Sequence, residues 1–247
     1  MTESFGALCS DFYVNMKLNV KLDLPTSRET VLDLFERVRR QYPRMESFKR
    51  YKDELALETK QGDMPQQWLA IRSASIRSGT VNPDSLADAY APHRHVLEVV
   101  PFYLSVSPLD IDFLELLYGF DLMASGNHDQ IVYRALFEQT AMAGLMDLDD
   151  ATPIECQPVF GVAFGEGKRC EAHIEVKTRS AEATENGFSA EPISIYLTMR
   201  QYGPMSELAD LGRALNDLTQ RGEELIESSV VPGLIVPIRN AIVIGGG

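Results

Sequence analysis

Hydrophobic and polar residues alternate without a break from Phe12 to Leu24, and this pattern predicts a long β-strand with one buried face. The row expected to face the core is entirely apolar: Phe12, Val14, Met16, Leu18, Val20, Leu22 and Leu24. Residues 112–123 alternate in the same way, with an inward row of Leu114, Leu116, Tyr118, Phe120 and Leu122. A third long strand is expected over 191–203, where the apolar side is formed by Ile193, Ile195, Leu197 and Met199.

Two helical segments are expected in the first half of the chain. Thr26-Ser27-Arg28-Glu29 has the sequence of a capping box, and the helix that it starts should end before Pro43. The apolar positions of this helix have helical spacing: Val31, Leu34, Phe35 and Val38. Asn82-Pro83 predicts an N-cap followed by proline at the first helical position, in a segment that Pro92 and Pro101 punctuate.

In the second half a helix is expected over about 128–146, and Ser206 is expected to cap a long last helix. The proline-broken apolar run 230–244 suggests a short strand or an extended segment. Shorter strands are predicted at 53–60, 67–79, 156–165 and 169–179.

Both halves of the chain, 1–107 and 108–247, thus have the order strand, helix, two or three strands, helix. Alternating strands with helices between them favour an α+β fold with a long curved antiparallel sheet and helices packed on one face. We expect two similar halves or one continuous domain. The element order is similar to that of the TATA-binding-protein-like architecture, a saddle of curved sheet backed by long helices.

The net charge and the first residues of the chain indicate which partners and which cellular location to expect. The chain has 247 residues and a net charge of −13, from 23 basic and 36 acidic residues. Binding to nucleic acid or to an anionic membrane depends on an excess of Lys and Arg, so we expect neither partner. The first residues lack the basic region and apolar run of a signal peptide, and a cytoplasmic location is expected.

Gly126-Asn127-His128-Asp129 matches one signature block of the calcineurin-like metallophosphoesterases, in which the Asn and His hold a two-metal centre. The other blocks are missing from the sequence, since no Asp-x-His precedes it and only His173 follows it. Asn127 can instead cap a helix, with Asp129 in the first turn and Gln130 at the third position. We interpret the motif as a helix start with His128 at the surface, and we expect no metal.

The remaining candidate motifs also have plainer interpretations. His93 and His95 would lie about 200° apart on a helix, so they form no chelate. His173 is expected on a solvated strand face with Glu171.

The run 161–168 is interpreted as a hairpin turn rather than a phosphate loop, and 147–150 lacks the glycine and glutamate of a calcium loop. The final Gly-Gly-Gly is similar to the tail of ubiquitin-like carriers, but we interpret it as an ordinary terminal segment.

The outward rows of the long strands are the best candidate for function. They combine aromatic and basic side chains, which dominate the energetics of protein interfaces. The residues expected to bind a partner are Tyr13, Asn15, Lys17, Lys21, Tyr196, Arg200 and Tyr202. We therefore expect a non-catalytic binding or scaffold protein that has no cofactor and uses this face to bind a protein partner or a second copy of itself. The alternative is an enzyme of unfamiliar family with a pocket between sheet and helices.

Overall fold

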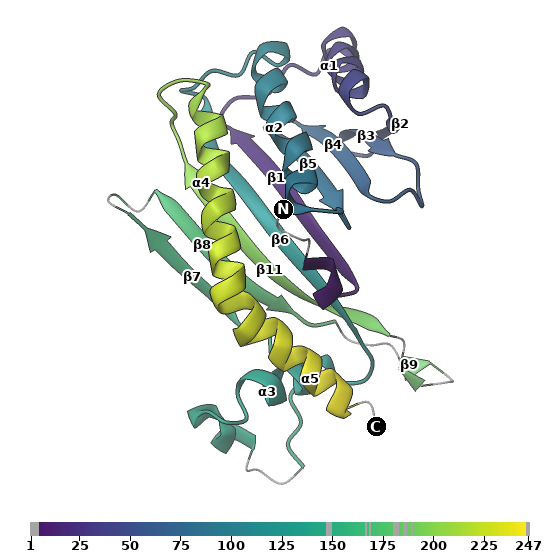
Figure 1. The fold of residues 1–247 in the computed structure, drawn as a ribbon, viewed down its shortest axis with the longest axis vertical. Coiled ribbons are helices and arrows are strands. Elements are labelled where there is room, and N and C mark those ends of the chain that lie inside the picture. Colours follow the sequence, from purple (N-terminus) through teal and green to yellow (C-terminus); the bar gives the residue numbers. More distant parts are fainter. Residues whose placement is uncertain are drawn as a thin grey trace.

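The structure is a computed structural model that describes residues 5–146, 150–165, 167, 169–179, 183–184, 187–188 and 190–245. Its main feature is one antiparallel nine-stranded sheet in the order β2-β3-β4-β5-β1-β6-β11-β8-β7 (Figure 1). The strands of this sheet are β1 (Asp11–Val20), β2 (Met45–Arg50), β3 (Leu55–Thr59), β4 (Gln66–Arg72), β5 (Ser75–Val81), β6 (Ile111–Ala124), β7 (Val159–Phe164), β8 (Cys170–Lys177) and β11 (Glu191–Tyr202). A separate hairpin pairs β9 (Ala183–Thr184) with β10 (Gly187–Phe188).

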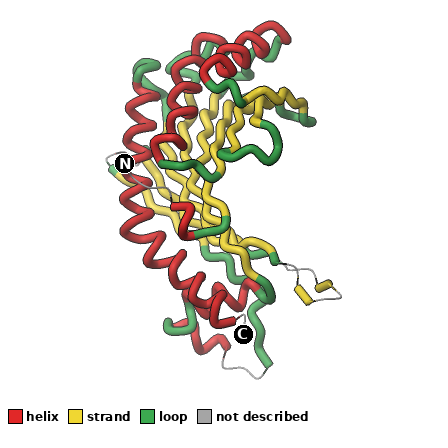
Figure 2. Tube along the Cα trace, turned by 45° about the vertical axis from the view of Figure 1, so that its right-hand side comes forward, coloured by secondary structure: helices red, strands yellow, loops and turns green. Residues whose placement is uncertain are grey.

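Long helices cover one face of this sheet, and no described helix covers the opposite face (Figures 1 and 2). The α-helices are α1 (Arg28–Gln41), α2 (Leu86–Tyr103), α3 (His128–Leu136), α4 (Asp210–Leu225) and α5 (Val236–Gly245). The shorter or wider helical segments are η1 (Phe5–Leu8), η2 (Ala141–Met146) and the π-helix η4 (Ile226–Ile235). The expected α+β fold with an antiparallel sheet and helices is therefore confirmed.

The core lies between the sheet and the helices. Phe12, Val14, Met16, Leu18 and Val20 of β1 are all buried, as the alternating pattern predicts. The inward row of β6 and the four apolar residues of β11 are buried with them. The helix residues Val31, Leu34, Phe35 and Val38 cover this layer from α1. The long alternating strands were predicted well because each has one face against this core.

Several expected boundaries in the first half were wrong. β1 ends at Val20, so Leu22 lies beyond the strand, where it is exposed. Ser27, not Thr26, caps α1 by accepting a hydrogen bond from the Thr30 N–H. Two strands, β4 and β5, replace the single strand expected at 67–79, and β2 was not predicted at all.

The expected start of α2 was also wrong. Asn82 adopts a positive φ of 50° and bonds back to β1, where its side-chain oxygen accepts a hydrogen bond from the Phe12 N–H. The helix begins at Leu86 after the N-cap Ser85 and runs through both Pro92 and Pro101.

The end of the chain differs most from the expectation. Residues 226–245 are helical and continue α4, rather than forming an extended segment. Pro232 lies within η4, where it supplies no N–H to the ladder, and the helix continues through it in a wider π-helical turn. Ser206 is not the N-cap either, because α4 starts at Asp210, whose carboxylate accepts hydrogen bonds from the Ser206 and Glu207 N–H groups. The expected helix over 128–146 is divided into α3 and η2.

The run Asp210–Ile244 is one helix whose length and mean hydropathy of 1.3 over its most apolar 18-residue window would suffice to cross a membrane. It was the one such helix found in a search of the described residues. Ile226, Val230, Ile235 and Ile238 of this run are fully buried against the rest of the protein. By length and composition alone, a helix of this kind is weak support for a membrane span.

Candidate functional site

The open face of the sheet is formed by the side chains that alternate with the buried rows. The antiparallel register places Tyr13 opposite Gly119 and Gly119 opposite Tyr196, so the three residues form one row across β1, β6 and β11. The next row across the same strands contains Asn15, Leu117 and Thr198, and the one after it Lys17, Glu115 and Arg200. We call this surface the open face, and it extends from β4 to β8 through the same register.

Glycines allow aromatic rings to lie flat on the open face. A Cβ on Gly119 would come within 2.1 Å of the Tyr13 ring, and a Cβ on Gly79 would come within 2.3 Å of the Trp68 indole. These side chains therefore cover the glycine positions instead of projecting into solvent. Tyr13 also lies against Tyr196, with ring centroids 6.4 Å apart. Burial, followed by the neighbouring Tyr196 hydroxyl, raises the pKa of Tyr13, so this phenol stays neutral and available as a donor.

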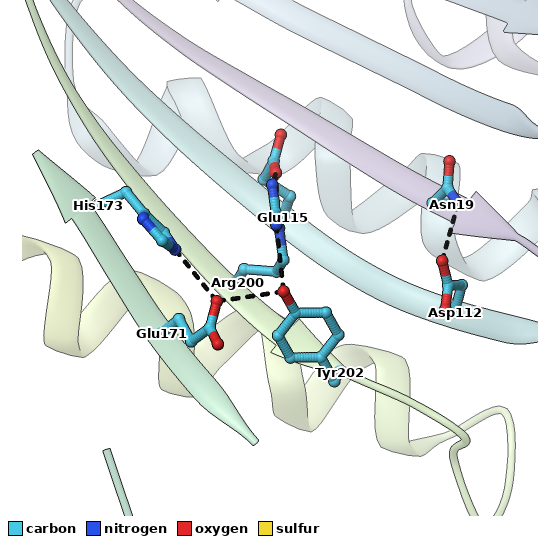
Figure 3. A network of polar contacts seen from close by, with 7 residues as sticks. All are labelled: Asn19, Asp112, Glu115, Glu171, His173, Arg200 and Tyr202. Atoms are coloured by element: carbon cyan, nitrogen blue, oxygen red, sulfur yellow. Dashed lines mark hydrogen bonds and ion pairs between the residues drawn. The ribbon is translucent and has the colours of Figure 1, made fainter. Parts of the chain in front are cut away.

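A chain of polar contacts crosses β6, β11 and β8 at one end of the face (Figure 3). The Arg200 Nε donates to Glu115 Oε2 at 2.9 Å, and Arg200 Nη1 lies 3.2 Å from the Tyr202 hydroxyl. That hydroxyl donates to Glu171 at 3.1 Å, and His173 Nε2 lies 3.1 Å from the same carboxylate. The hydrogen bond from His173 is the main cause that lowers the pKa of the Glu171 carboxyl, and the Tyr202 hydroxyl adds to it.

Phe113 connects this network to the basic residues of β1. The Lys17 ammonium lies 5.1 Å from the Phe113 ring centroid, and the Arg200 guanidinium lies 4.6 Å from it. Both distances are within the range of cation–π attraction. Among the described residues no carboxylate lies within ion-pair distance of Lys17, whereas Arg200 is paired with Glu115. Lys17 is thus a cation on this part of the open face without a carboxylate partner among the described residues, and its ammonium can pair with a ligand.

Two neighbouring grooves run along the open face. One, of about 450 Å³, is lined by residues of β1, β4, β5 and β6, among which Lys17, Arg72 and Arg77 are cationic and Glu115 is acidic. The other, of about 470 Å³, shares Arg72 and Arg77 and includes Trp68. Arg72 and Arg77 share a single carboxylate, that of Glu54. The first groove therefore carries a local excess of positive charge in a protein whose net charge is −13.

Six of the seven predicted binding residues lie on the open face: Tyr13, Asn15, Lys17, Tyr196, Arg200 and Tyr202. Lys21 does not, because it follows the end of β1 and its ammonium donates to the Leu109 carbonyl at 3.2 Å. Sequence reasoning missed the cross-strand partners Glu115, Phe113 and Trp68. The sequence pattern predicted His173 on a solvated strand face. Its side chain is 42% exposed, and it also hydrogen-bonds to Glu171.

The Gly126–Asp129 motif forms the start of α3. The Asn127 side-chain oxygen accepts from the Gln130 N–H at 3.0 Å, as expected of an N-cap. The expectation that His128 lies at the surface was wrong, because its side chain is 1% exposed and hydrogen-bonds to the Ala124 carbonyl and the Arg179 N–H. A search of the described residues found no group of three or more His, Cys, Asp and Glu side chains placed to hold a metal.

Residues 147–149, 166, 168 and 246–247, which belong to the motifs considered above, lie outside the described residues.

Ser78 and His93 form the one hydrogen bond of a nucleophile–base type in the described core, at 2.7 Å between Oγ and Nδ1. Both side chains are inaccessible, with exposed fractions of 1% and 0%. Burial lowers the pKa of His93 to about 4, so the imidazole is neutral at pH 7. A pair that no substrate can reach is a structural pair.

A separate hollow of about 540 Å³ lies between α1 and the ends of β2, β3 and β4. Acidic and basic side chains both line it, including Asp23, Arg28, Asp53 and Glu54.

No family model matches the chain, and no curated protein matches its sequence.

Proposed function

We propose that the protein is a non-catalytic binding module whose open face docks a protein partner. The observation that carries this proposal is the row of aromatic rings and basic groups held flat on a sheet face that α1, α2 and α4 leave uncovered. Rigid aromatic side chains supply contact area while few torsions are frozen on binding. The polar network across β6, β11 and β8 fixes the neighbouring side chains before any partner arrives, which lowers the entropic cost of association.

The charges of the first groove favour an acidic segment of the partner. Lys17 has no carboxylate partner among the described residues, and Arg72 and Arg77 share one. A carboxylate entering the groove would meet these three cations, with Glu115 in the groove lining and Glu54 beside the two arginines as like charges. Tyr13, Tyr196 and Trp68 would contact the apolar part of the same segment. A second copy of this chain, which is itself acidic, is the alternative occupant.

The alternative function is an enzyme with its site in the hollow beside α1. Glu54, one of the acidic groups there, is already paired with Arg72 and Arg77. This pairing gives Glu54 a structural contact at the hollow, and we therefore prefer the binding function.

The strand order also supports a duplication of the two halves. β1 and β6 lie side by side at the centre, with β5 next to β1 and β11 next to β6. Outside these, β4 and β8 take corresponding places, followed by β3 and β7. We infer that each half contributes one such set of strands, and that β2 is an addition to the first half.

The test uses the substitutions Lys17→Ala and Tyr196→Ala together. Arg200 is left in place, because removing it would strand the Glu115 carboxylate, whose side chain is only 16% exposed. We expect the variant to melt within a few degrees of the wild type and to bind its partner from the native host at least tenfold more weakly.

A matched control carries Arg40→Ala on α1 and Tyr103→Ala at the end of α2, which removes one cation and one tyrosine from helices that cover the other face of the sheet. Both of these side chains are exposed. Equal partner recovery by the wild type and the open-face variant would overturn the proposal, as would a loss of recovery by the control alone.

A further inference from the structure

We propose that β7 pairs with β7 of a second copy of this chain, so that two nine-stranded sheets join at their edges. The two edges of the sheet differ strongly in chemistry. β2 contains Glu46, Lys49 and Arg50, and the first two form ion pairs with Lys60 and Glu58. β7, with the sequence Val-Phe-Gly-Val-Ala-Phe, has no charged residue.

An edge strand without charges is unusual, because unpaired backbone groups and apolar side chains invite pairing with another chain. Val159 and Phe160 are each 65% exposed, and they lie on opposite faces of the strand. Among the described residues no strand pairs with the outer edge of β7. Charges protect β2 against such pairing, and nothing described protects β7.

The ladder between β7 and β8 shows which backbone groups are free. The Val176 N–H donates to the Pro158 carbonyl at 3.0 Å, so 158 and 176 form a hydrogen-bonded pair. Because hydrogen-bonded and non-bonded pairs alternate in an antiparallel ladder, Phe160, Val162 and Phe164 direct their backbone groups toward β8. The N–H and C=O groups of Val159, Gly161 and Ala163 therefore point outward.

These outward groups are self-complementary about Gly161. An antiparallel pair centred there places Gly161 opposite its own copy, Val159 opposite Ala163, and Ala163 opposite Val159. Each of these pairs can exchange two backbone hydrogen bonds. β7 has no charged side chain that could meet a like charge across the two-fold axis, and on the open-face side the His173 ring covers Gly161, where a Cβ would lie 2.9 Å from its Nδ1.

The helix side of the same edge carries an apolar hollow that the second copy would cover. This hollow of about 360 Å³ is lined largely by apolar side chains, including Phe137, Pro158, Phe160 and Leu234. In the pairing centred on Gly161, Val162 of one copy lies opposite Phe160 of the other, and Phe164 lies opposite Pro158 at the rim of the hollow. A continuous apolar strip would thus be buried on this side of the joined sheet.

An antiparallel contact between two β7 strands produces a closed dimer. An isologous contact uses the same strand twice and leaves no further β7 edge, so growth stops at two copies. The charged β2 edge offers no second site of the same kind. Each copy has a net charge of −13, so the two copies repel at a distance, and added salt should screen this repulsion and tighten the dimer.

The experiment measures the mass of the full chain by sedimentation at micromolar concentration, at low and at moderate salt. The wild type should be a dimer, with a dissociation constant that falls as salt rises. Phe160→Lys should give a folded monomer, because this side chain is largely exposed within one copy, and its melting temperature should equal that of the wild type diluted until it is monomeric. Phe48→Lys makes the same change at an exposed phenylalanine of β2 and should remain a dimer.

Ala163→Lys provides a second variant of the β7 edge and should also be monomeric, which keeps the test decisive if Phe160→Lys fails to fold. A wild type that is monomeric at both salt concentrations would overturn the proposal. So would a folded Phe160→Lys or Ala163→Lys that is still a dimer. The open-face variant Lys17→Ala, Tyr196→Ala should stay dimeric, so failure of this proposal is distinguishable from failure of the docking proposal.

Discussion

At the scale of single residues, Asn127 shows how a motif associated with metal chemistry serves a local structural purpose. Its side-chain oxygen caps α3 through the Gln130 N–H, and its side-chain nitrogen donates to the Pro153 carbonyl at 3.0 Å. Asp129 beside it accepts from the Cys156 N–H and the Thr178 hydroxyl. These contacts account for the polar residues of the motif without a metal ion.

Asn127→Ala should lower the free energy of unfolding by about 1 kcal/mol, because the cap of α3 is lost. Asn127→Ser retains an accepting oxygen at the N-cap without placing a carboxylate against the Pro153 carbonyl, and should lose less. Denaturant titration measures both values. Stoichiometric manganese, iron or zinc in the purified protein, lost on substitution of His128, would contradict the capping interpretation.

His93 makes the stability of the protein depend on pH. Its pKa is lowered by burial to about 4, whereas an unfolded histidine titrates near 6.5. Between these values the unfolded chain binds a proton that the folded chain excludes, so the free energy of unfolding should fall as the pH drops from about 6.5 to 4. The loss attributable to His93 should total roughly 3 kcal/mol.

His93→Asn offers the control for this effect, since its amide can keep a hydrogen bond to Ser78 but does not titrate. The variant should be less stable than the wild type at pH 7, and the difference should shrink toward pH 4.5 in denaturant titrations. An unchanged difference over this range would show that His93 does not cause the pH dependence.

Local signals revealed the N-cap of α3, but not the contacts of the open face. Asn127 and Gln130 are three residues apart, and their spacing alone predicts the hydrogen bond. Glu115, Glu171 and Arg200 come from three different strands, so their meeting depends on a register that sequence alternation does not specify. The outward side chains of each long strand were therefore predicted, and the network that they form across strands was not.

At the scale of whole elements, a similar rule explains which strands and helices were predicted. β1, β6 and β11 each bury one full face, which produces a long alternation. β2 is an edge strand in which only Met45 is buried, so it has no periodic signal. The two prolines at 232 and 237 suggested an interruption after α4, but the π-helical turns of η4 accommodate Pro232 and the helix continues.

The packing of α4 on β6 can be tested at two glycines of the same helix. A Cβ on Gly222 would lie 2.6 Å from the Tyr118 ring, whereas a Cβ on Gly212 would meet nothing within 4 Å. Gly222→Ala should therefore destabilise the protein by about 1–3 kcal/mol through overpacking, despite the higher helix propensity of alanine. Gly212→Ala should stabilise it by about 0.5–1 kcal/mol.

Thermal or denaturant unfolding of these two variants measures the effect. Equal stabilisation by both alanines would mean that α4 does not approach β6 as closely at Gly222 as the structure shows.

At the scale of the whole molecule, the sheet separates two kinds of surface. The helices bury one face and leave the open face, with its flat aromatic rings and local positive charge, accessible to a partner. The uncharged edge at β7 lies at the end of the same sheet, so dimerisation there would extend the open face rather than cover it. Both proposed contacts can therefore exist in one assembly.

Photocrosslinking from defined positions tests the docking claim most directly. A photoreactive residue at Thr198, in the centre of the open face, is compared with one at Asp217, which is exposed on α4 on the opposite side of the sheet. In an extract of the native host, we expect a discrete crosslinked partner from Thr198, weakened by Lys17→Ala with Tyr196→Ala, and none from Asp217. The same partner crosslinked from Asp217 and not from Thr198 would contradict the account.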